Sequence, residues 1–324
     1  MNAQSLWSLG YGSHAIETYS SDARGAFSIA MGYSTTASGD VSTAMGHLTT
    51  ASGHVSTAMG SYTTASGFES TAMGSYTTAS GDISTAMGNY TTASGDISTA
   101  MGSYTTASGV VSTAMGGFTT ASGWASTAMG NYTTASGDES TAMGNYTTAS
   151  DFSSMVIGQF NSSGNGVTNS ATAFNTANTA FVIGNGTDLG NRSDAFKVMF
   201  NGDTTVGNDL TVSGDVVVSS DARLKANIVS LGSTLARLLR IDGKSYTMKK
   251  DGKQKIGVLA QDVQKVFPEL VSEDDNQMLA VNYQGLVPVL INALKEQDGK
   301  MKEQDDKISR LEVLVEKLMS DKKQ

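Results

Sequence analysis

Residues 84–97 read Ser-Thr-Ala-Met-Gly-Asn-Tyr-Thr-Thr-Ala-Ser-Gly-Asp-Ile, and close copies of this unit follow one another from about residue 26 to residue 158. Its Met-Gly pair returns every 14 residues, and the series closes at Ile157-Gly158. The methionines are Met31, Met45, Met59, Met73, Met87, Met101, Met115, Met129 and Met143. Repetition at one fixed period predicts an architecture of stacked repeats.

Each repeat has the composition of short strands rather than of a helix. Glycine at every seventh position and many β-branched threonines would give a helix a large propensity deficit. Two strand-like pieces, such as Ser84–Met87 and Tyr90–Ser94, are separated by Gly88 and Gly95, which suit tight turns because glycine accepts positive φ. Stacking such coils pairs each strand with its copy in the next coil, so the sequence predicts a parallel β-roll.

The interior of this roll is expected to be thin. Alternate side chains of a strand face opposite ways, so Ser and Ala fill the interior, while Met and an aromatic column from Tyr62 to Tyr146 line other faces. Small residues bury little apolar area. We therefore expect three rolls to share a Met-lined interface, as a homotrimer.

The repeat over about Phe27–Gly158 resembles the head repeats of trimeric autotransporter adhesins of the YadA-like type, and related repeats in phage tail fibres. The resemblance implies parallel β-rolls packed three together. It also implies, for some members, binding to a host surface.

The function of the repeat itself stays open between a spacer rod and a surface that binds a host receptor or glycan. Variable residues fall at the same turn of successive coils, namely His54, Phe68, Val110 and Trp124. A third interpretation is a lattice-binding array, because Thr-Thr pairs recur from Thr63-Thr64 to Thr147-Thr148. A glycan hydrolase is not expected, because it needs paired carboxylates and the repeat holds only isolated acids.

Composition excludes several other classes of protein. The net charge is −9, and no Lys or Arg occurs between Arg24 and Arg192, so nucleic acid is not an expected partner. No apolar run is long enough to cross a bilayer, and Met1–Gly12 lacks the pattern of a secretion signal. The expected location is a virion tail fibre, or a bacterial cell surface or extracellular space.

Catalysis by a Ser-His-Asp triad or by a metal lacks its ingredients. The chain has no Cys, and its three histidines are His14, His47 and His54, which we interpret as exposed turn residues. No metal site and no cofactor are expected.

After Phe160 the period is lost, and residues 159–219 are predicted to form a β-rich connector. Strands are expected at residues 180–184, 195–200, 209–212 and 215–218, where short apolar runs lie between polar turns.

The segment that begins at Ser220 is interpreted together with three motifs in the chain that follows it. Three motifs lie downstream: Ile-Gly-Val-Leu-Ala-Gln-Asp-Val from residue 256, Phe-Pro-Glu-Leu-Val from residue 267, and Val-Asn-Tyr-Gln-Gly-Leu from residue 281. Together with Ser220–Ile228 they resemble the intramolecular chaperone domain of phage tail spikes and fibres, of the endosialidase type. The resemblance extends from Ser220 to the C-terminus.

This resemblance implies a chaperone that guides trimer assembly and then cuts itself off. Carried over, Ser220 is the nucleophile, Lys225 is the base, and Ser220-Asp221 is the cleaved bond. A serine hydroxyl is a weak nucleophile until a base takes its proton, and a lysine acts as that base only when desolvation lowers its pKa. The packed trimer is expected to supply this environment. The activity is that of a single-turnover, self-cleaving serine peptidase.

The last segment follows a heptad. One core position is occupied by Val287, Leu294, Met301, Ile308 and Val315, and the other by Leu290, Gln297, Gln304, Leu311 and Leu318. This repeat predicts a coiled coil, in which the two Gln layers fix the register at a cost in stability. Gly299 weakens the helix locally. Residues 287–294 also fit a helix packed on its own domain.

The predicted fold is therefore a mainly β, trimeric N-terminal part followed by an α+β chaperone domain that ends in a helix. The segments are a lead-in (1–26), β-roll repeats (27–158), a connector (159–219), an auto-processing chaperone domain (220–290) and a coiled coil (291–324). The alternative is a non-cleaving surface adhesin with a permanent trimerisation domain.

Overall fold

The computed structural model describes residues 7–9, 16–18, 21–274 and 277–321. The chain divides into an N-terminal unit, Met1–Asp215, and a C-terminal unit, Val216–Gln324. Much of the lead-in expected over residues 1–26, including His14 and most of Met1–Gly12, lies outside the described residues.

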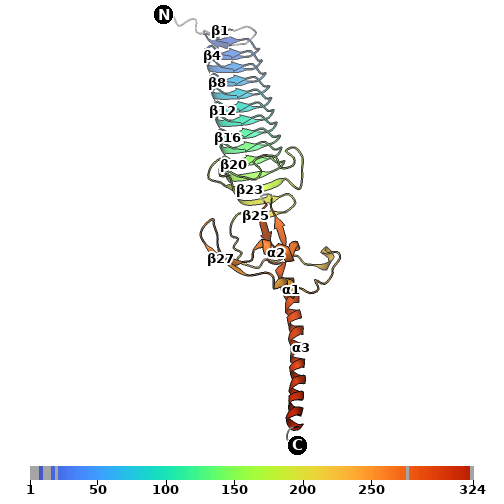
Figure 1. Ribbon diagram of the computed structural model, residues 1–324. Helices are drawn as coiled ribbons and strands as arrows, with labels where there is room; N and C mark the ends of the chain where they lie inside the picture. Colours follow the sequence, from blue (N-terminus) through green and yellow to red (C-terminus); the bar gives the residue numbers. More distant parts are fainter. Residues whose placement is uncertain (1–6, 10–15, 19–20, 275–276, 322–324) are drawn as a thin grey trace. The chain divides into compact units, whose positions relative to one another are not determined.

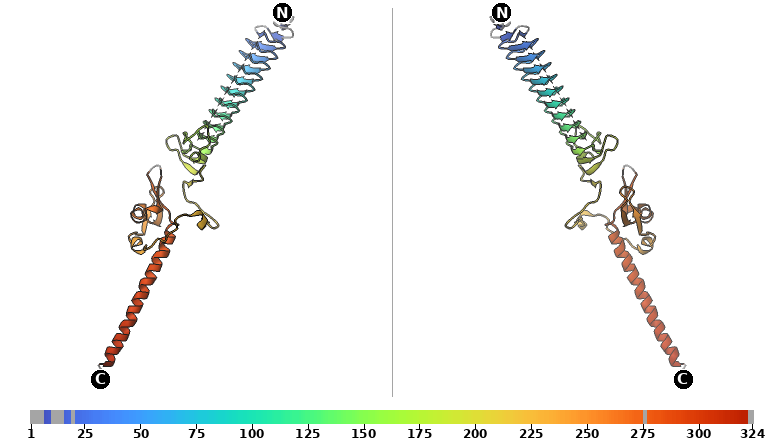
Figure 2. Two further views of the ribbon diagram at one scale, coloured as in Figure 1. Left: turned by 90° about the vertical axis from the view of Figure 1, so that its right-hand side faces the viewer. Right: turned by 90° about the vertical axis from the view of Figure 1, so that its left-hand side faces the viewer.

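The N-terminal unit is a parallel β-roll in which each coil stacks on the next (Figures 1 and 2). Strands pair with their copies in register, so that Thr85 lies beside Thr99 and Met87 beside Met101. The backbone of one coil therefore donates to the next, as in the 2.8 Å bond from Thr85 N–H to the Ser98 carbonyl. The predicted β-roll is confirmed.

Two sheets form the walls of the roll. The 15-stranded sheet consists of β1 (Trp7–Leu9), β2 (Ile16–Thr18), β4 (Ile29–Tyr33), β6 (Thr43–His47), β8 (Thr57–Ser61), β10 (Thr71–Ser75), β12 (Thr85–Asn89), β14 (Thr99–Ser103), β16 (Thr113–Gly117), β18 (Thr127–Asn131), β20 (Thr141–Asn145), β22 (Met155–Gln159), β23 (Thr179–Asn185), β24 (Asp194–Met199) and β25 (Thr204–Val206). The 10-stranded sheet consists of β3 (Asp22–Ala23), β5 (Thr36–Ala37), β7 (Thr50–Ala51), β9 (Thr64–Ala65), β11 (Thr78–Ala79), β13 (Thr92–Ala93), β15 (Thr106–Ala107), β17 (Thr120–Ala121), β19 (Thr134–Ala135) and β21 (Thr148–Ala149).

The interior holds three small residue types. In the coil of residues 84–97, Ala86 and Ala93 are fully buried, as predicted, and so is Ser84. The first threonine of each pair, Thr91 in this coil, is also fully buried, which the sequence analysis did not foresee. Because only the second threonine reaches the surface, the threonines of this sheet form a single partly exposed column and not a column of pairs, and lattice binding stays a prediction.

The turns differ from the prediction in where the left-handed residues lie. Gly88 has a φ of 125°, but the other left-handed residues of the coil are Tyr90, at 52°, and Ile97, at 57°. Gly95 is required instead by the closeness of the next coil, because a Cβ atom there would lie 2.0 Å from the Gly109 carbonyl oxygen. The first strand, β12, is shifted relative to Ser84–Met87 and ends just before Tyr90. The second, β13, is shorter than Tyr90–Ser94, and the turn at Ile97 precedes the next strand.

The left-handed aromatic residues form a ladder along the roll. From Tyr62 to Phe160, each ring stacks on the equivalent ring of the next coil, with centroids 4.5–4.9 Å apart. A bulky residue in the left-handed region costs about 1–2 kcal/mol, and a stacked aromatic pair contributes about 0.5–1.5 kcal/mol. The stacking therefore offsets much of the strain of this turn.

The roll ends where Asp151 replaces the glycine of the preceding coils. Its carboxylate is buried and accepts bonds from the N–H groups of Thr168 (2.6 Å) and Thr179 (2.7 Å), which tie the following loop to the last coil. Strands β23 and β24 confirm two predicted strands of the connector. The strands predicted at residues 209–212 and 215–218 were wrong: these segments are exposed and are not paired in a sheet.

The C-terminal unit is a small α+β domain that continues into a long helix. Its elements are η1 (Ala222–Leu224), α1 (Leu235–Leu238), β26 (Lys244–Thr247), β27 (Gln254–Gly257), α2 (Ala260–Val266), η2 (Pro268–Leu270), β28 (Val271–Glu273), β29 (Leu279–Val281) and α3 (Leu286–Asp321). The core is built by Val263, Val266, Phe267 and Val289. The first of the three downstream motifs forms the end of β27 and most of α2, and the second forms η2. The third runs from the end of β29 to the start of α3.

One carboxylate joins α1 to α3. Glu296 accepts hydrogen bonds from the Ser233 hydroxyl (2.7 Å) and from the N–H groups of Thr234 and Leu235, which are free donors at the start of α1. The bond from Ser233, followed by that from Thr234, holds the pKa of Glu296 below its ordinary value.

We expect Gly109→Ala to destabilise the roll, because the added Cβ would lie 2.0 Å from the Gly123 carbonyl oxygen. Forcing the coils apart should lower the free energy of unfolding by about 1–3 kcal/mol. The matched control is Gly117→Ser, since that column carries Ser103 and Asn131 in neighbouring coils and an added Cβ meets only the Asn131 side chain. Melting temperatures followed by circular dichroism test this, and equal values for the two variants would contradict close coil stacking.

The second prediction concerns pH. A carboxyl whose pKa is lower in the folded chain stabilises the fold above its unfolded pKa and loses that contribution as the pH falls through its folded pKa. Glu296→Gln should therefore lower the melting temperature of the C-terminal unit near neutral pH and flatten its decrease in acid. The control is Glu303→Gln, which removes only an exposed ion pair with Lys307 on the same helix. If both variants shift the melting curve equally, Glu296 does not cap α1.

Candidate functional site

A short turn brings the predicted nucleophile and base together. Asp221 caps the 3-10 helix η1, with its side chain accepting a 2.8 Å bond from Arg223 N–H. At the other end, Lys225 N–H donates to the Ala222 carbonyl (3.1 Å). This single turn folds the chain back, so the side chain of Lys225 returns to Ser220.

Lys225 contacts Ser220 through two oxygen atoms. Its Nζ atom donates to Ser220 Oγ at 2.7 Å and to the Ser220 main-chain oxygen at 3.1 Å. The first contact has the distance that a base and a nucleophile need; to act as the base, neutral Lys225 would accept the hydroxyl proton across it. The second places a positive charge on the carbonyl of the Ser220-Asp221 peptide, which is the bond expected to break.

A second pair lies within the same turn. Arg223 binds Asp221 with both ends of its guanidinium, from Nε to Oδ1 (3.0 Å) and from Nη2 to Oδ2 (2.8 Å). These bonds hold the pKa of the Asp221 carboxyl below its ordinary value and raise the pKa of Arg223. The sequence analysis did not single out this pair, although an acid and an arginine two residues apart in a tight turn are a usable signal.

The whole segment is exposed to solvent in the single chain. Every residue from Ser219 to Lys225 is exposed to solvent, so nothing in one copy removes water from Ser220 or Lys225. The arrangement has the contacts of a Ser-Lys dyad without the desolvation that such a base requires.

The two residues that follow each Ser-Gly pair form an exposed turn, and these turns lie one above another along the roll as the turn column. The predicted variable residues belong to this column. His54 stacks on Phe68 (5.4 Å between ring centroids), and Phe68 and Trp124 are about half exposed. Aspartates in this column are capping groups: Asp82 accepts a 2.8 Å bond from Phe68 N–H, and Asp138 one from Trp124 N–H.

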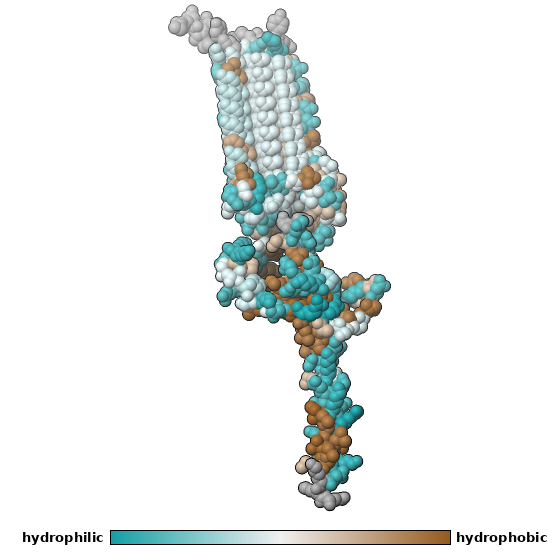
Figure 3. All heavy atoms as spheres, in the orientation of Figure 1, coloured by the Kyte–Doolittle hydropathy of each residue, from teal (hydrophilic) through white to brown (hydrophobic). Residues whose placement is uncertain are grey.

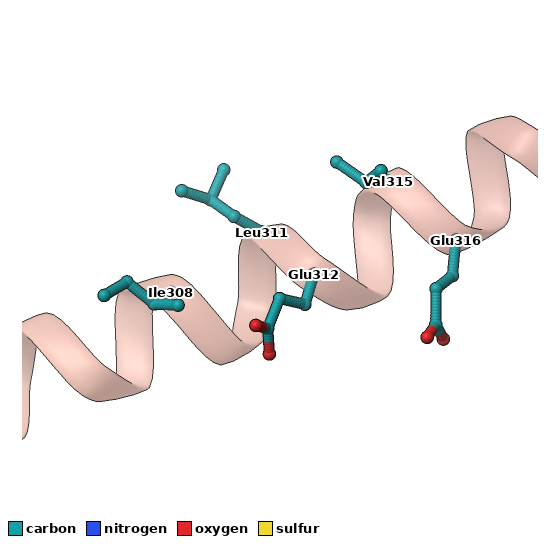
Figure 4. Close-up of a pocket in the computed structure, with 5 residues that line it drawn as sticks. All are labelled: Ile308, Leu311, Glu312, Val315 and Glu316. Atoms are coloured by element: carbon teal, nitrogen blue, oxygen red, sulfur yellow. The ribbon is translucent and has the colours of Figure 1, made fainter.

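The long helix α3 carries the predicted heptad side chains on one side. Figure 4 shows Ile308, Leu311 and Val315 along one stripe, with Glu312 and Glu316 beside it, around a shallow hollow on the helix surface. In Figure 3, a hydrophilic stretch of α3 is followed by a hydrophobic stretch nearer to its C-terminal end. The helix passes through Gly299 without a break.

The described residues offer neither a membrane-crossing helix nor a metal-binding group. None of the helices that the structure describes is long and apolar enough to cross a membrane. Over the same residues, no group of three or more His, Cys, Asp or Glu side chains is arranged to hold a metal ion.

Comparison with known families assigns both parts of the chain. The family described as the YadA head domain repeat matches overlapping windows that run from residue 23 to residue 161. The family described as the chaperone of endosialidase matches residues 220–272. No curated protein matches the chain. The chain therefore contains a segment that matches the YadA head repeat, followed by a segment starting at Ser220 that matches the chaperone of endosialidase.

Proposed function

We propose that this chain forms a homotrimeric fibre, of the phage tail or surface-adhesin kind, whose C-terminal domain guides assembly and then releases itself by cutting the Ser220-Asp221 bond. The observation that carries this proposal is the 2.7 Å bond from Lys225 Nζ to Ser220 Oγ. In such a fibre, the exposed turn column of the roll is the part available to a host receptor or glycan.

The reaction is a hydrolysis that occurs once per chain. Neutral Lys225 takes the proton from Ser220 Oγ, and the oxygen adds to the carbonyl carbon of the scissile peptide. The carbon–nitrogen bond to Asp221 breaks, and the proton moves to the leaving nitrogen, which becomes a new amino terminus. Because the hydroxyl and the carbonyl belong to the same residue, the ester is a strained four-membered lactone of Ser220. Water then opens this lactone, which restores the serine hydroxyl and leaves a carboxylate on Ser220. The contact of Lys225 with the Ser220 carbonyl supports this choice of bond.

The exposure of the dyad supports a link between cleavage and assembly. A base that is solvated in one chain and covered in the assembled trimer would cut only after folding. Removing the chaperone at that point removes the easy route back to unfolded chains, so the fibre persists through slow unfolding.

Charge and hydropathy of the roll support association through the methionine face. The methionines project from the 15-stranded sheet and stay partly exposed in one chain, whereas the outer face of the 10-stranded sheet carries Thr and Ser in every strand except β3, where Asp22 takes the place of Thr. The exposed acids of residues 26–160 lie in the turn column, and no Lys or Arg balances them. Contact through the methionines buries apolar area and leaves these like charges in a separate column.

Intact mass after purification tests the cleavage. The wild type should give two fragments, one ending at Ser220 and one beginning at Asp221. Ser220→Ala, and Lys225→Arg, which keeps the charge but does not lose a proton, should slow cleavage by at least about 100-fold. Ser219→Ala is the matched control and should cut normally. A single full-length wild-type chain, purified as a trimer, would support the non-cleaving adhesin instead.

The methionine face is tested by placing charges on it in the full chain. Met87→Lys with Met101→Lys should cost about 3 kcal/mol or more, because an unpaired charge is buried at the contact between copies. The matched control is Ile83→Lys with Ile97→Lys, on the exposed turn column. Light scattering gives the molar mass, and circular dichroism gives the melting temperature. The interface is elsewhere if the control pair is affected as strongly as the methionine pair.

A further inference from the structure

The C-terminal unit contains an apolar hollow of about 390 Å³ between the end of α1 with the residues after it, Val258 just after β27, and the start of α3. Its lining includes Leu238, Ile241, Val258, Leu286 and Leu290. None of the residues that line it is charged, and Leu290 remains 46% exposed. An open apolar surface of this kind in a small domain indicates a contact with another chain segment.

The core of this unit is too small for its length. Among its described residues, the buried apolar side chains are those of Val263, Val266, Phe267, Val289 and Ala293. Small domains bury a low fraction of their surface and are correspondingly marginal. Further apolar side chains, brought from outside one copy, would complete this core.

A candidate for those side chains follows directly after Lys225. Ile228, Val229 and Leu231 are 67%, 82% and 46% exposed, and their stretch has no regular secondary structure. A few residues later the chain is anchored, because the Thr234 hydroxyl donates to the Val289 carbonyl (3.0 Å). The three apolar side chains therefore lie between the dyad and a fixed point.

We infer that the hollow of each copy receives Ile228, Val229 and Leu231 of a second copy. This inference rests on the proposed homotrimer and names the surfaces that would hold it together. It is independent of whether the chain cuts.

The heptad explains why the occupant comes from a second copy. Leu290 lines the hollow and also occupies a core position of the heptad, as do Leu311 and Leu318 further along α3. Association of the helices along this stripe brings a neighbouring chain to the rim of the hollow. In one copy the segment stays in solvent, although its anchor at Thr234 lies in the same domain.

Docking would also change the surroundings of the dyad. Lys225 is three residues before Ile228, so holding Ile228 in an apolar hollow fixes the C-terminal side of the turn against another protein surface. Water would then be excluded from Lys225 only in the assembled form, which is the condition that a lysine base needs.

Disulfide trapping tests the contact, and the absence of native cysteine makes it clean. The full chain carries Val229→Cys and Leu239→Cys, two exposed positions, the second at the rim of the hollow. Ser220→Ala is included so that the chain stays whole whether or not the wild type cuts. After mild oxidation, gel electrophoresis without reductant should show covalent dimers and trimers that reductant removes.

The controls separate this contact from chance collision. Val229→Cys with Lys249→Cys, the latter in the exposed turn between β26 and β27, should form at least about tenfold less covalent oligomer, as should each single cysteine variant. A disulfide within one chain, or no excess over these controls, overturns the inference. If the cysteine variant cross-links but the wild-type chain does not cut, the contact between copies is supported and the proposed cleavage is rejected.

Discussion

The close stacking of glycine backbones is the constraint on which the N-terminal unit depends. A Cβ atom at Gly95 would lie 2.0 Å from the Gly109 carbonyl oxygen, so a larger residue there would push the two coils apart. Glycine at this position therefore lets successive coils stay at the spacing of paired strands. In the repeated coils the interior side chains are small, since Ala, Ser and Thr are the fully buried ones, and the turns are sharp enough for Tyr90 and Ile97 to adopt left-handed φ. The aromatic ladder then follows, because equivalent turn residues are brought to stacking distance.

The same regularity creates a problem of alignment. Because successive coils are nearly identical, three rolls displaced by one coil would keep most of their contacts, and a regular strand array specifies its own register weakly. In the proposed trimer, the energy difference between correct and shifted alignments would have to come from a part of the chain that does not repeat. In this chain that part is the C-terminal unit, where the polar Gln297 and Gln304 interrupt an otherwise apolar seam and would penalise a shifted pairing.

The sequence predicts the features that depend on period and composition, and it is less informative about those that depend on the exact frame of the coil. The β-roll follows from spacing alone. The buried Thr91 does not, because a shift of one residue in the assumed strand changes which threonine faces inward. Asp209–Val212 and Asp215–Val218 have the composition of strands, yet they belong to none of the sheets that the described residues form. At the site, the sequence alone indicates Ser220 and the lysine five residues after it. The ion pair of Asp221 with Arg223 becomes evident only from the geometry of the turn.

Geometry and reactivity have different origins at Ser220. The distance between Lys225 Nζ and Ser220 Oγ is set by one local turn, with Asp221 as its cap and Arg223 bound to that cap, so this distance needs no partner chain. The dielectric environment of the two groups is not local, since every residue of the turn is exposed in one copy. A dyad built this way is complete in shape as soon as the turn forms and remains solvated until other surfaces cover it. In the proposed mechanism, folding of a single chain is therefore insufficient to trigger cleavage, and assembly is the step that can.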